Sequence, residues 1–167
     1  MQSTEKRKAA GGTMGTKQFD NGRYDGEMLE GAMHGRGIRT WWSGARYEGE
    51  FKNDVRAGQG KYLYADGSRY EGGFQDNMKS GRGTFAAANG DRYEGMYVDD
   101  QRNGQGVYRW ADGSVYEGEW KDGMQDGQGK FWEVSGSRYE GEYRAGERCG
   151  LGVHATADGR RFVGEWA

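Results

Sequence analysis

Residues 116–120 read Tyr-Glu-Gly-Glu-Trp, so that a ring or a glycine alternates with a glutamate at every step. A period of two is typical of a β-strand, in which successive side chains point to opposite faces. The two rings and the glycine therefore share one face of the expected strand, and the two glutamates share the other. The same alternation returns at residues 47–51 and 139–143.

This alternating segment recurs every 23 residues. An aromatic residue opens each copy, and a glycine follows two residues later. Further glycine columns begin at Gly35, Gly37 and Gly44. Because no insertion breaks the register from Tyr24 to Ala167, the chain is a tandem repeat of one unit. The opening positions are Tyr24, Tyr47, Tyr70, Tyr93, Tyr116, Tyr139 and Phe162.

A second alternating run follows the first in every unit, as at residues 104–110. A short polar segment such as 121–124 joins two runs and predicts a hairpin. Asp-Gly and Asn-Gly pairs such as Asp66-Gly67 suit turns that need a positive φ, and they lead into the next unit. The sequence therefore predicts an all-β fold, a single-layer twisted antiparallel β-meander of tandem 23-residue hairpins. Such a sheet would hold about 14 strands.

Composition restricts what can hold this sheet together. The 167 residues include 33 glycines, no proline and 14% aromatics, and the mean hydropathy is −1.11. Such a hydropathy is typical of disordered chains, but those chains lack rings. Since a glycine weakens a strand unless something packs on its backbone, we expect rings to lie over the glycines of neighbouring strands. The expected product is a thin ladder of strands with no hidden interior.

The ends of the chain depart from the full unit. Residues 1–14 hold no full copy of the pattern, and we expect them to be disordered. The last strand, Phe162–Trp166, would have an open edge, which either pairs with another chain or is a short edge guarded by Glu165. The repeat domain is expected over 15–167, with a half repeat at 15–23, repeats that start at 24, 47, 70, 93, 116 and 139, and a partial repeat at 162–167.

Charge and cysteine content narrow the class of protein. Lys and Arg number 24 and Asp and Glu number 26, so the net charge is −2, which argues against nucleic acid as a partner. The one cysteine, Cys149, fits a reducing compartment. The chain has neither a long apolar run nor an apolar N-terminal segment, so we expect no membrane span and no signal peptide. The expected location is the cytoplasm.

The unit that opens with Tyr-Glu-Gly-Glu-Trp at 116–120 and closes with Gly-x-Gly resembles the MORN repeat (membrane occupation and recognition nexus). The resemblance covers residues 15–167. It departs at Met28, where an aromatic residue is usual, and at Glu133 and Thr156, which replace rings. The resemblance implies an elongated scaffold. Members occur attached to enzymes, in junctional membrane proteins, and in cytoskeletal and ciliary proteins that include the almost wholly repetitive radial spoke head proteins.

The aromatic face of the sheet is the candidate binding site. A single layer leaves that face uncovered, and a large exposed apolar area marks an interaction site in which Tyr and Trp are favoured anchors. An amphipathic helix or an extended peptide would cover it. Alternatively, the rings only hold the sheet together, and both roles are compatible. The predicted contact residues are Tyr62, Tyr64, Phe74, Phe85, Tyr97, Tyr108, Trp110, Trp120, Phe131 and Trp132.

The charged residues argue against catalysis. Glutamates such as Glu48 and Glu117 recur in every unit near arginines such as Arg46, whereas an active site is normally unique. We therefore expect cross-strand charge pairs, no cofactor and no metal. The expected function is a non-enzymatic scaffold that binds partner proteins in a large cytoskeletal or ciliary (axonemal) assembly. The alternative is a peripheral membrane module that binds anionic phospholipid, against which the net charge and the lack of a polybasic cluster speak.

Overall fold

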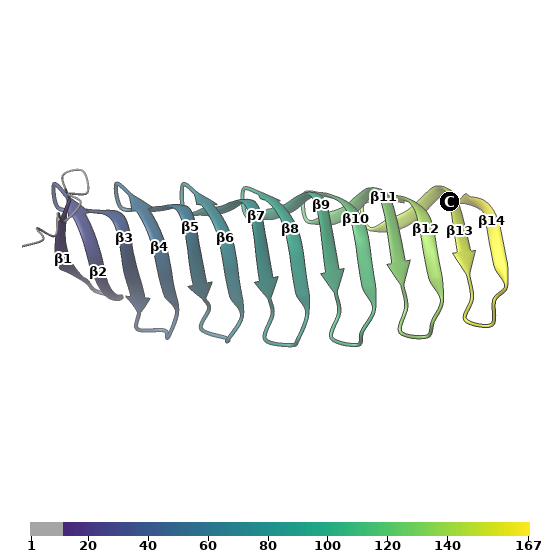
Figure 1. Ribbon diagram of the computed structural model, residues 1–167, viewed down its shortest axis with the longest axis horizontal. Helices are drawn as coiled ribbons and strands as arrows, with labels where there is room; N and C mark the ends of the chain where they lie inside the picture. Colours follow the sequence, from purple (N-terminus) through teal and green to yellow (C-terminus); the bar gives the residue numbers. More distant parts are fainter. Residues whose placement is uncertain (1–11) are drawn as a thin grey trace, which may run out of the picture.

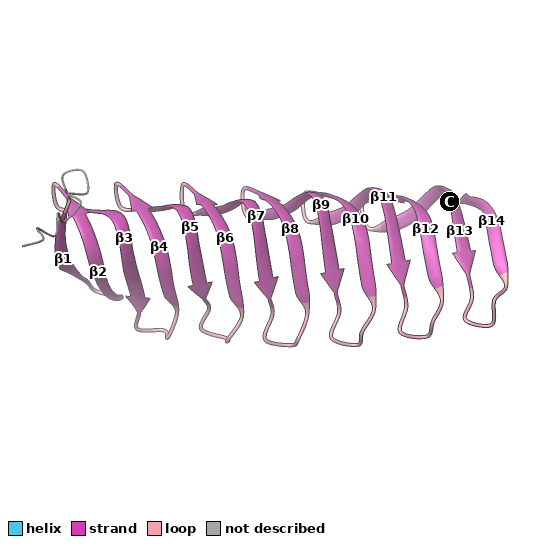
Figure 2. Ribbon diagram, viewed as in Figure 1, coloured by secondary structure: helices cyan, strands magenta, loops and turns pink. Residues whose placement is uncertain are grey.

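The computed structural model describes residues 12–167, and within that range the chain forms 14 β-strands and no helix. Figure 1 shows the strands side by side in one open row, and Figure 2 shows that only short loops join them. The strands are β1 (Thr13–Phe19), β2 (Gly22–Leu29), β3 (Ala32–Trp41), β4 (Arg46–Lys52), β5 (Val55–Leu63), β6 (Arg69–Gln75), β7 (Met78–Ala86), β8 (Arg92–Val98), β9 (Gln101–Arg109), β10 (Val115–Lys121), β11 (Met124–Trp132), β12 (Arg138–Arg144), β13 (Glu147–Ala155) and β14 (Arg161–Trp166).

The order of the strands in the sheet is their order in the chain. Each strand from β1 to β14 lies beside its chain neighbour, and every neighbouring pair is antiparallel. The predicted all-β, single-layer antiparallel meander of tandem hairpins is therefore confirmed, and so is its expected size of 14 strands.

The sheet begins earlier than expected. β1 starts at Thr13, which pairs with Met28 of β2, whereas the sequence placed residues 1–14 in a disordered segment. The antiparallel register between the two strands runs without a break out to this pair, so Thr13 and its neighbour belong to the repeat domain. The remainder of that prediction, residues 1–11, lies outside the described residues.

Two kinds of turn join the strands. Within a unit the hairpin closes through two residues of positive φ, such as Asn53 (50°) and Asp54 (67°) between β4 and β5, which is the mark of a type I′ turn. Between units, the Tyr64 carbonyl accepts the Gly67 N–H at 3.1 Å, and Gly67 has a φ of 88°. The Asp-Gly and Asn-Gly pairs therefore turn the chain as predicted. Turns of this second kind follow one long edge of the sheet (Figure 1).

Most turns also bond to the repeat before them. The Asp54 N–H donates to the Met33 carbonyl at 3.0 Å, and the Met33 N–H donates to the Asp54 carboxylate at 2.9 Å. At the opposite edge, the Ala88 N–H donates to the Ser68 hydroxyl at 3.1 Å. Successive hairpins are thus tied together at both edges, which fixes the spacing of the repeats. Equivalent turn bonds join Asn77 to Arg56, Asp100 to Lys79, Gly123 to Arg102 and Gly146 to Gln125.

A β-bulge interrupts each hairpin. In the β4–β5 pair the register shifts just after Gly49, which faces Gly60, and Gly58 takes a φ of 58°. The Glu50 carboxylate accepts the Gln59 N–H at 3.0 Å and so satisfies a donor within the bulge. The expectation that this glycine column receives rings is wrong, because it supplies left-handed backbone instead. The column is Gly35, Gly58, Gly81, Gly104, Gly127 and Gly150, with φ between 55° and 105°.

A second set of glycines lies beneath rings, as predicted. These glycines form an unbroken row across the sheet, one in every strand, and each faces the glycine of the next strand. A Cβ atom on Gly60 would meet the Tyr47 ring at 2.5 Å, so the ring lies directly on this backbone. The row is Gly15, Gly26, Gly37, Gly49, Gly60, Gly72, Gly83, Gly95, Gly106, Gly118, Gly129, Gly141, Gly152 and Gly164.

The tyrosine that opens each unit is the core of the molecule. Its hydroxyl donates to the carbonyl three residues further along its own strand, as Tyr47 does to Glu50 at 3.0 Å. In a straight strand these residues stand roughly 10 Å apart, so the strand bends around the ring at the bulge. The sheet therefore encloses a hidden interior, contrary to the expectation from sequence. Six tyrosines are at most 1% exposed, namely Tyr24, Tyr47, Tyr70, Tyr93, Tyr116 and Tyr139.

These tyrosines belong to a continuous ladder of rings. Tyr47 meets Phe51 of its own unit and Phe74 of the next edge to face, with ring centroids 5.0 Å apart in both pairs. Aromatic pairs in this geometry contribute about 0.5–1.5 kcal/mol each beyond the area that they bury. The ladder runs Tyr24, Phe51, Tyr47, Phe74, Tyr70, Tyr97, Tyr93, Trp120, Tyr116, Tyr143, Tyr139 and Trp166.

Candidate protein-binding face

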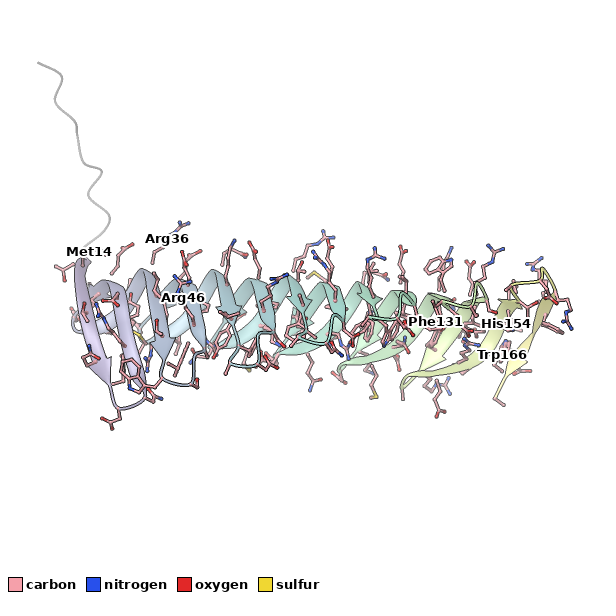
Figure 3. All side chains as sticks on the ribbon, turned by 90° about the horizontal axis from the view of Figure 1, so that it is seen from below. Met14, Arg36, Arg46, Phe131, His154 and Trp166 are labelled. Carbon is pink, nitrogen blue, oxygen red and sulfur yellow. The ribbon has the colours of Figure 1, made fainter. Side chains whose placement is uncertain are left out.

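The sheet has two chemically different faces. The face toward which the tyrosine column points is called the ring face, and the opposite one is called the charged face. Because side chains alternate along a strand, each strand contributes to both. In Figure 3, Arg36 projects from one side of the sheet, whereas Phe131 and Trp166 lie on the other.

Six of the predicted contact residues lie half-buried on the ring face, beside the buried ladder. They form two groups of touching rings. The Tyr64 ring lies 4.4 Å from Tyr62 and 6.0 Å from Phe85, measured between centroids. The second group comprises Tyr108, Trp110 and Phe131, in which the Trp110 ring lies 4.5 and 5.4 Å from its two neighbours. These six rings share one face of the sheet, and each is partly exposed.

The other four predicted contacts are placed elsewhere. Phe74, Tyr97 and Trp120 are only 6%, 3% and 5% exposed, so their prediction as surface contacts is wrong. Each follows its tyrosine by four residues, beyond the bulge, and the bend of the strand presses it against the tyrosine column. Trp132 is exposed, but it lies on the charged face between Val115 and Arg138. It follows Phe131 directly, so the alternation of side chains sends it to the opposite side.

A column of cations lies over the rings, which the sequence analysis did not identify. The Arg56 guanidinium stands 5.0 Å from the Tyr62 ring, and the Lys79 ammonium stands 5.3 Å from the Phe85 ring. Cations so placed are attracted to the negative faces of aromatic rings. These cations stand at one position of the repeat, the second residue after each type I′ turn, which is Arg56, Lys79, Arg102 and Arg148. The same position is neutral at Met33 and Gln125.

The cations of this column are mostly bonded to neutral groups. Arg56 donates to the Asn77 carbonyl and Arg102 donates to the Gly123 carbonyl, both at 2.6 Å. Burial lowers the pKa of Lys79, and the nearby Asp100 carboxylate partly opposes that effect.

At the C-terminal end, Arg148 pairs with the Glu133 carboxylate at 3.4 Å. Arg148 is therefore compensated by a carboxylate, whereas Arg56 and Arg102 retain donors that no carboxylate within residues 12–167 contacts in an ion pair.

Two phenols of the ring face, Tyr64 and Tyr108, stay neutral near physiological pH. Burial raises the pKa of Tyr64 to about 12. Burial also raises the pKa of Tyr108 to about 12, assisted by the Asp91 carboxylate that accepts its hydroxyl at 2.8 Å. That bond in turn lowers the pKa of Asp91. The ring face therefore offers uncharged rings and positive side chains, with the Asp91 carboxylate bonded to Tyr108.

The charged face carries the expected cross-strand charge pairs between Lys61 and Glu71 and between Lys130 and Glu140, whereas Arg46 pairs with a glutamate of its own strand β4. Arg46 contacts Glu48 at 2.8 Å, and Lys61 contacts Glu71 at 3.0 Å. These side chains are largely exposed, so each pair contributes about 1 kcal/mol at most. Glu50, the second glutamate of the Tyr-Glu-Gly-Glu segment, has a different role. Its carboxylate accepts the Gln59 N–H within the bulge.

Three hollows lie on the charged face, with volumes of about 430, 360 and 540 Å³. Met14 and Ile38 line the first beside bare glycine backbone. The second has an apolar floor near Leu63 and three arginines around it. The arginines of the second hollow are Arg46, Arg69 and Arg92. This hollow is the most cationic of the three and would suit an anionic group.

Within the described residues, no group of three or more His, Cys, Asp or Glu side chains is placed to hold a metal ion. The same residues contain no helix that is long and apolar enough to cross a membrane.

At the open edge of the sheet, Phe162 of β14 occupies the position of the buried tyrosines yet is 52% exposed. Pairing of that edge with another chain stays a prediction.

Comparison with known proteins identifies the repeat. The model of a family described as MORN repeat matches six consecutive segments, residues 24–46, 47–69, 70–92, 93–115, 116–138 and 139–159. No curated protein matches the chain.

Solved structures give only a distant likeness. The TCP domain of Drosophila melanogaster SAS-4 (dCPAP), in complex with a proline-rich motif of Ana2 (dSTIL), is 12% identical with a TM-score of 0.49, and the match covers 100% of this chain and 98% of that one. A mutant TCP10 domain of Danio rerio CPAP is 8% identical with a TM-score of 0.30, over 87% and 90% of the two chains. Likeness at this level carries no argument about function.

Proposed function

Since the chain belongs to the MORN-repeat family, we propose that it is a non-enzymatic scaffold that binds a partner protein along the ring face. The observation that carries this proposal is the set of six half-buried rings on one face, in two groups that span neighbouring repeats, with only the cation column and no second sheet or helix over them. Rings held at a fixed position lose little conformational entropy on binding, which makes them good anchors. A helix or an extended peptide along the sheet would bury their exposed edges.

The setting that we favour is a large cytoskeletal or ciliary assembly in the cytoplasm. This part of the proposal rests on the resemblance to family members that consist almost wholly of repeats, which is an argument from analogy. A stiff row of hairpins tied at both edges would hold a partner extended along its length, as a spacer in an assembly requires.

The chain offers a matched pair of tryptophans to test the binding face. Trp110 lies half-buried on the ring face, and Trp132 lies on the charged face. Peptides would be selected from an unbiased displayed library against the full chain, and the affinity of the selected peptide would be measured for Trp110→Ala and Trp132→Ala. We expect Trp110→Ala to weaken binding by tenfold or more, corresponding to about 1.4 kcal/mol, and Trp132→Ala to change it by less than about twofold.

Two controls make this test decisive. Thermal unfolding shows whether either variant has lost structure, and Trp110→Phe, which keeps a ring, should retain most of the affinity. Selected peptides that respond to Trp132→Ala and not to Trp110→Ala would place binding on the charged face and contradict the proposal.

A second candidate function is binding of anionic phospholipid, and the second hollow favours it. Its arginines would face a phosphate headgroup, although the net charge of −2 opposes a membrane surface of the same sign. Flotation with anionic vesicles that is lost in Arg69→Glu with Arg92→Glu would support this function. Absence of flotation of the wild-type chain would remove it.

A further inference from the structure

The cation column indicates what kind of partner fits the ring face. We propose that the bound segment of the partner is acidic and lies along the sheet as a left-handed polyproline II helix, with a carboxylate at every third residue opposite Arg56, Lys79 and Arg102. This inference rests on the proposed function and goes further by naming the chemistry and the conformation of the partner segment.

Three consecutive repeats supply the positive charge. Arg56, Lys79 and Arg102 occupy the same position in the repeats, so they recur at one fixed interval. Arg102 is held most closely, with its guanidinium 4.3 Å from the Trp120 ring and one nitrogen bonded to the Gly123 carbonyl. An arginine has five N–H donors, so donors remain for a carboxylate. The cations are therefore fixed in place and still have unused donors.

Nearby acids compensate this charge only in part. The turn position next to Arg56 is the neutral Asn77, and the one next to Arg102 is Gly123. Only Lys79 has an acid there, Asp100, whose carboxylate accepts the Lys79 backbone N–H. For two of the three cations the turn residue whose carbonyl accepts the guanidinium is therefore neutral, and the aspartates that precede it, Asp76 and Asp122, form no ion pair with Arg56 or Arg102 within residues 12–167. A partner segment with negative charges would complement the column.

The spacing of the column restricts the backbone of the partner. Each repeat adds two strands, or about 9.6 Å along the sheet. The ring ladder agrees, because Tyr47 and Tyr70 are linked through Phe74 by centroid steps of 5.0 and 5.2 Å. Carboxylates that face all three cations must therefore recur at about this distance on one side of the partner.

Of the regular backbones, a polyproline II helix lies nearest to this interval. A polyproline II helix returns to the same side after three residues, or about 9.3 Å. A β-strand returns to the same side at about 6.7 and 13.4 Å, and an α-helix does so at about 10.5 Å after seven residues. Polyproline II segments also dock on aromatic surfaces, which the six half-buried rings beside the column provide. The positive charge of the column, its spacing along the sheet and the aromatic surface therefore all favour an acidic polyproline II segment.

Short synthetic peptides and the full chain test this proposal. The probe consists of four Glu-Pro-Pro triplets with a fluorescent label, and its matched control has the same composition with the glutamates placed consecutively. We expect the triplet peptide to bind at least about tenfold more tightly, since charge-assisted hydrogen bonds form at several positions only in the first case. The affinity should fall with added salt. A peptide of Lys-Pro-Pro triplets should not bind.

Variants locate the binding site. Arg56→Gln with Arg102→Gln should weaken binding of the triplet peptide about tenfold or more. Arg69→Gln with Arg92→Gln, on the charged face, is the matched control and should change it by less than about twofold. Should the ring-face variants fail to fold, the affinities of the two glutamate peptides for the wild-type chain still test the proposal. Equal affinity for both peptides, or a loss confined to the charged-face variants, would overturn the proposal.

The result also separates this proposal from the proposed function. Library peptides that bind through Trp110 but are basic, or are helical when bound, would leave the scaffold function intact and refute the acidic polyproline II segment. Failure of both library and triplet peptides to bind through the ring face would refute both.

Discussion

Tyr47 and Gly60 lie so close together that a Cβ atom on Gly60 would stand 2.4 Å from the Tyr47 hydroxyl. The same relationship recurs in the next unit, where the Tyr70 hydroxyl lies 2.3 Å from the equivalent point on Gly83. A row of glycines therefore exists because a row of rings occupies the space that their side chains would need. The fold and the half-buried rings beside this row depend on that packing.

Substitution of Gly60 tests this packing directly. Gly60→Ala would force the new methyl group into the Tyr47 ring, and we expect it to lower the free energy of unfolding by about 1–3 kcal/mol. The matched control is Gly164→Ala in the same row, where nothing lies within 4 Å of the added atom, and the expected change is within about 0.5 kcal/mol. Urea unfolding measures both. Equal effects at the two positions would contradict the proposed contact.

The tyrosine hydroxyl makes a separate contribution. Tyr70 is 1% exposed and donates to the Gly73 carbonyl at 3.0 Å. Tyr70→Phe keeps the ring but leaves that carbonyl without its partner, so we expect a loss of about 1 kcal/mol in thermal or urea unfolding. Tyr70→Ala removes the ring as well and should cost about 3–5 kcal/mol. A Phe variant as stable as the wild type would show that the bend of the strand does not need this hydrogen bond.

The bulge in the fourth full repeat lacks its acidic acceptor. Met96 stands where Glu50 and Glu119 accept a backbone N–H at 3.0 and 2.8 Å. We expect Met96→Glu to supply this acceptor to the Gln105 N–H and to raise the free energy of unfolding by about 0.5–1.5 kcal/mol. Met96→Leu, which cannot accept a hydrogen bond, should have no such effect. A gain in both variants would point to apolar packing as the cause.

The buried phenols predict how stability depends on alkaline pH. Burial raises the pKa of Tyr24, Tyr47 and Tyr93 from 10.0 to about 12 in the folded chain. Unfolded chains therefore lose these protons first, so the stability contributed by the neutral phenols is complete below pH 10 and declines as pH rises toward 12. Half of the phenols of the unfolded chain are ionised at pH 10, so the urea midpoint should already be lower at pH 10 than at pH 8 and should fall further at pH 11. Tyrosinate absorbance that rises fully before unfolding begins would contradict this assignment.

The sequence predicted the fold because its period carries the information. Tyr24, Gly26 and their equivalents mark strands, and pairs such as Asp66-Gly67 mark turns, so strand number and order follow without a structure. The bulge was not predicted, because a glycine needed for positive φ and a glycine needed for a ring look alike in sequence. Gly58 and Gly60 are an example, since they stand two residues apart and have these two different roles.

The same bulge explains which contact residues were misplaced. Trp120 follows Tyr116 with the correct alternation for an open face, but the bend buries it against the tyrosine column. Trp132 failed for a simpler reason, because the alternation itself assigns it to the charged face. Arg56 and its equivalents were missed because an isolated arginine in a polar turn region gives no sign of the ring beneath it.

The measurement that tests the account most directly is oxidative footprinting by hydroxyl radicals, read at single side chains by mass spectrometry, with and without a library-selected peptide. In the free chain we expect Tyr47 to be protected, Trp110 to react moderately and Trp132 to react readily, in line with their exposure. On binding, Trp110 should become protected while Trp132 remains reactive. Protection of Trp132 with unchanged reactivity at Trp110 would show that the partner binds the charged face and would contradict the account.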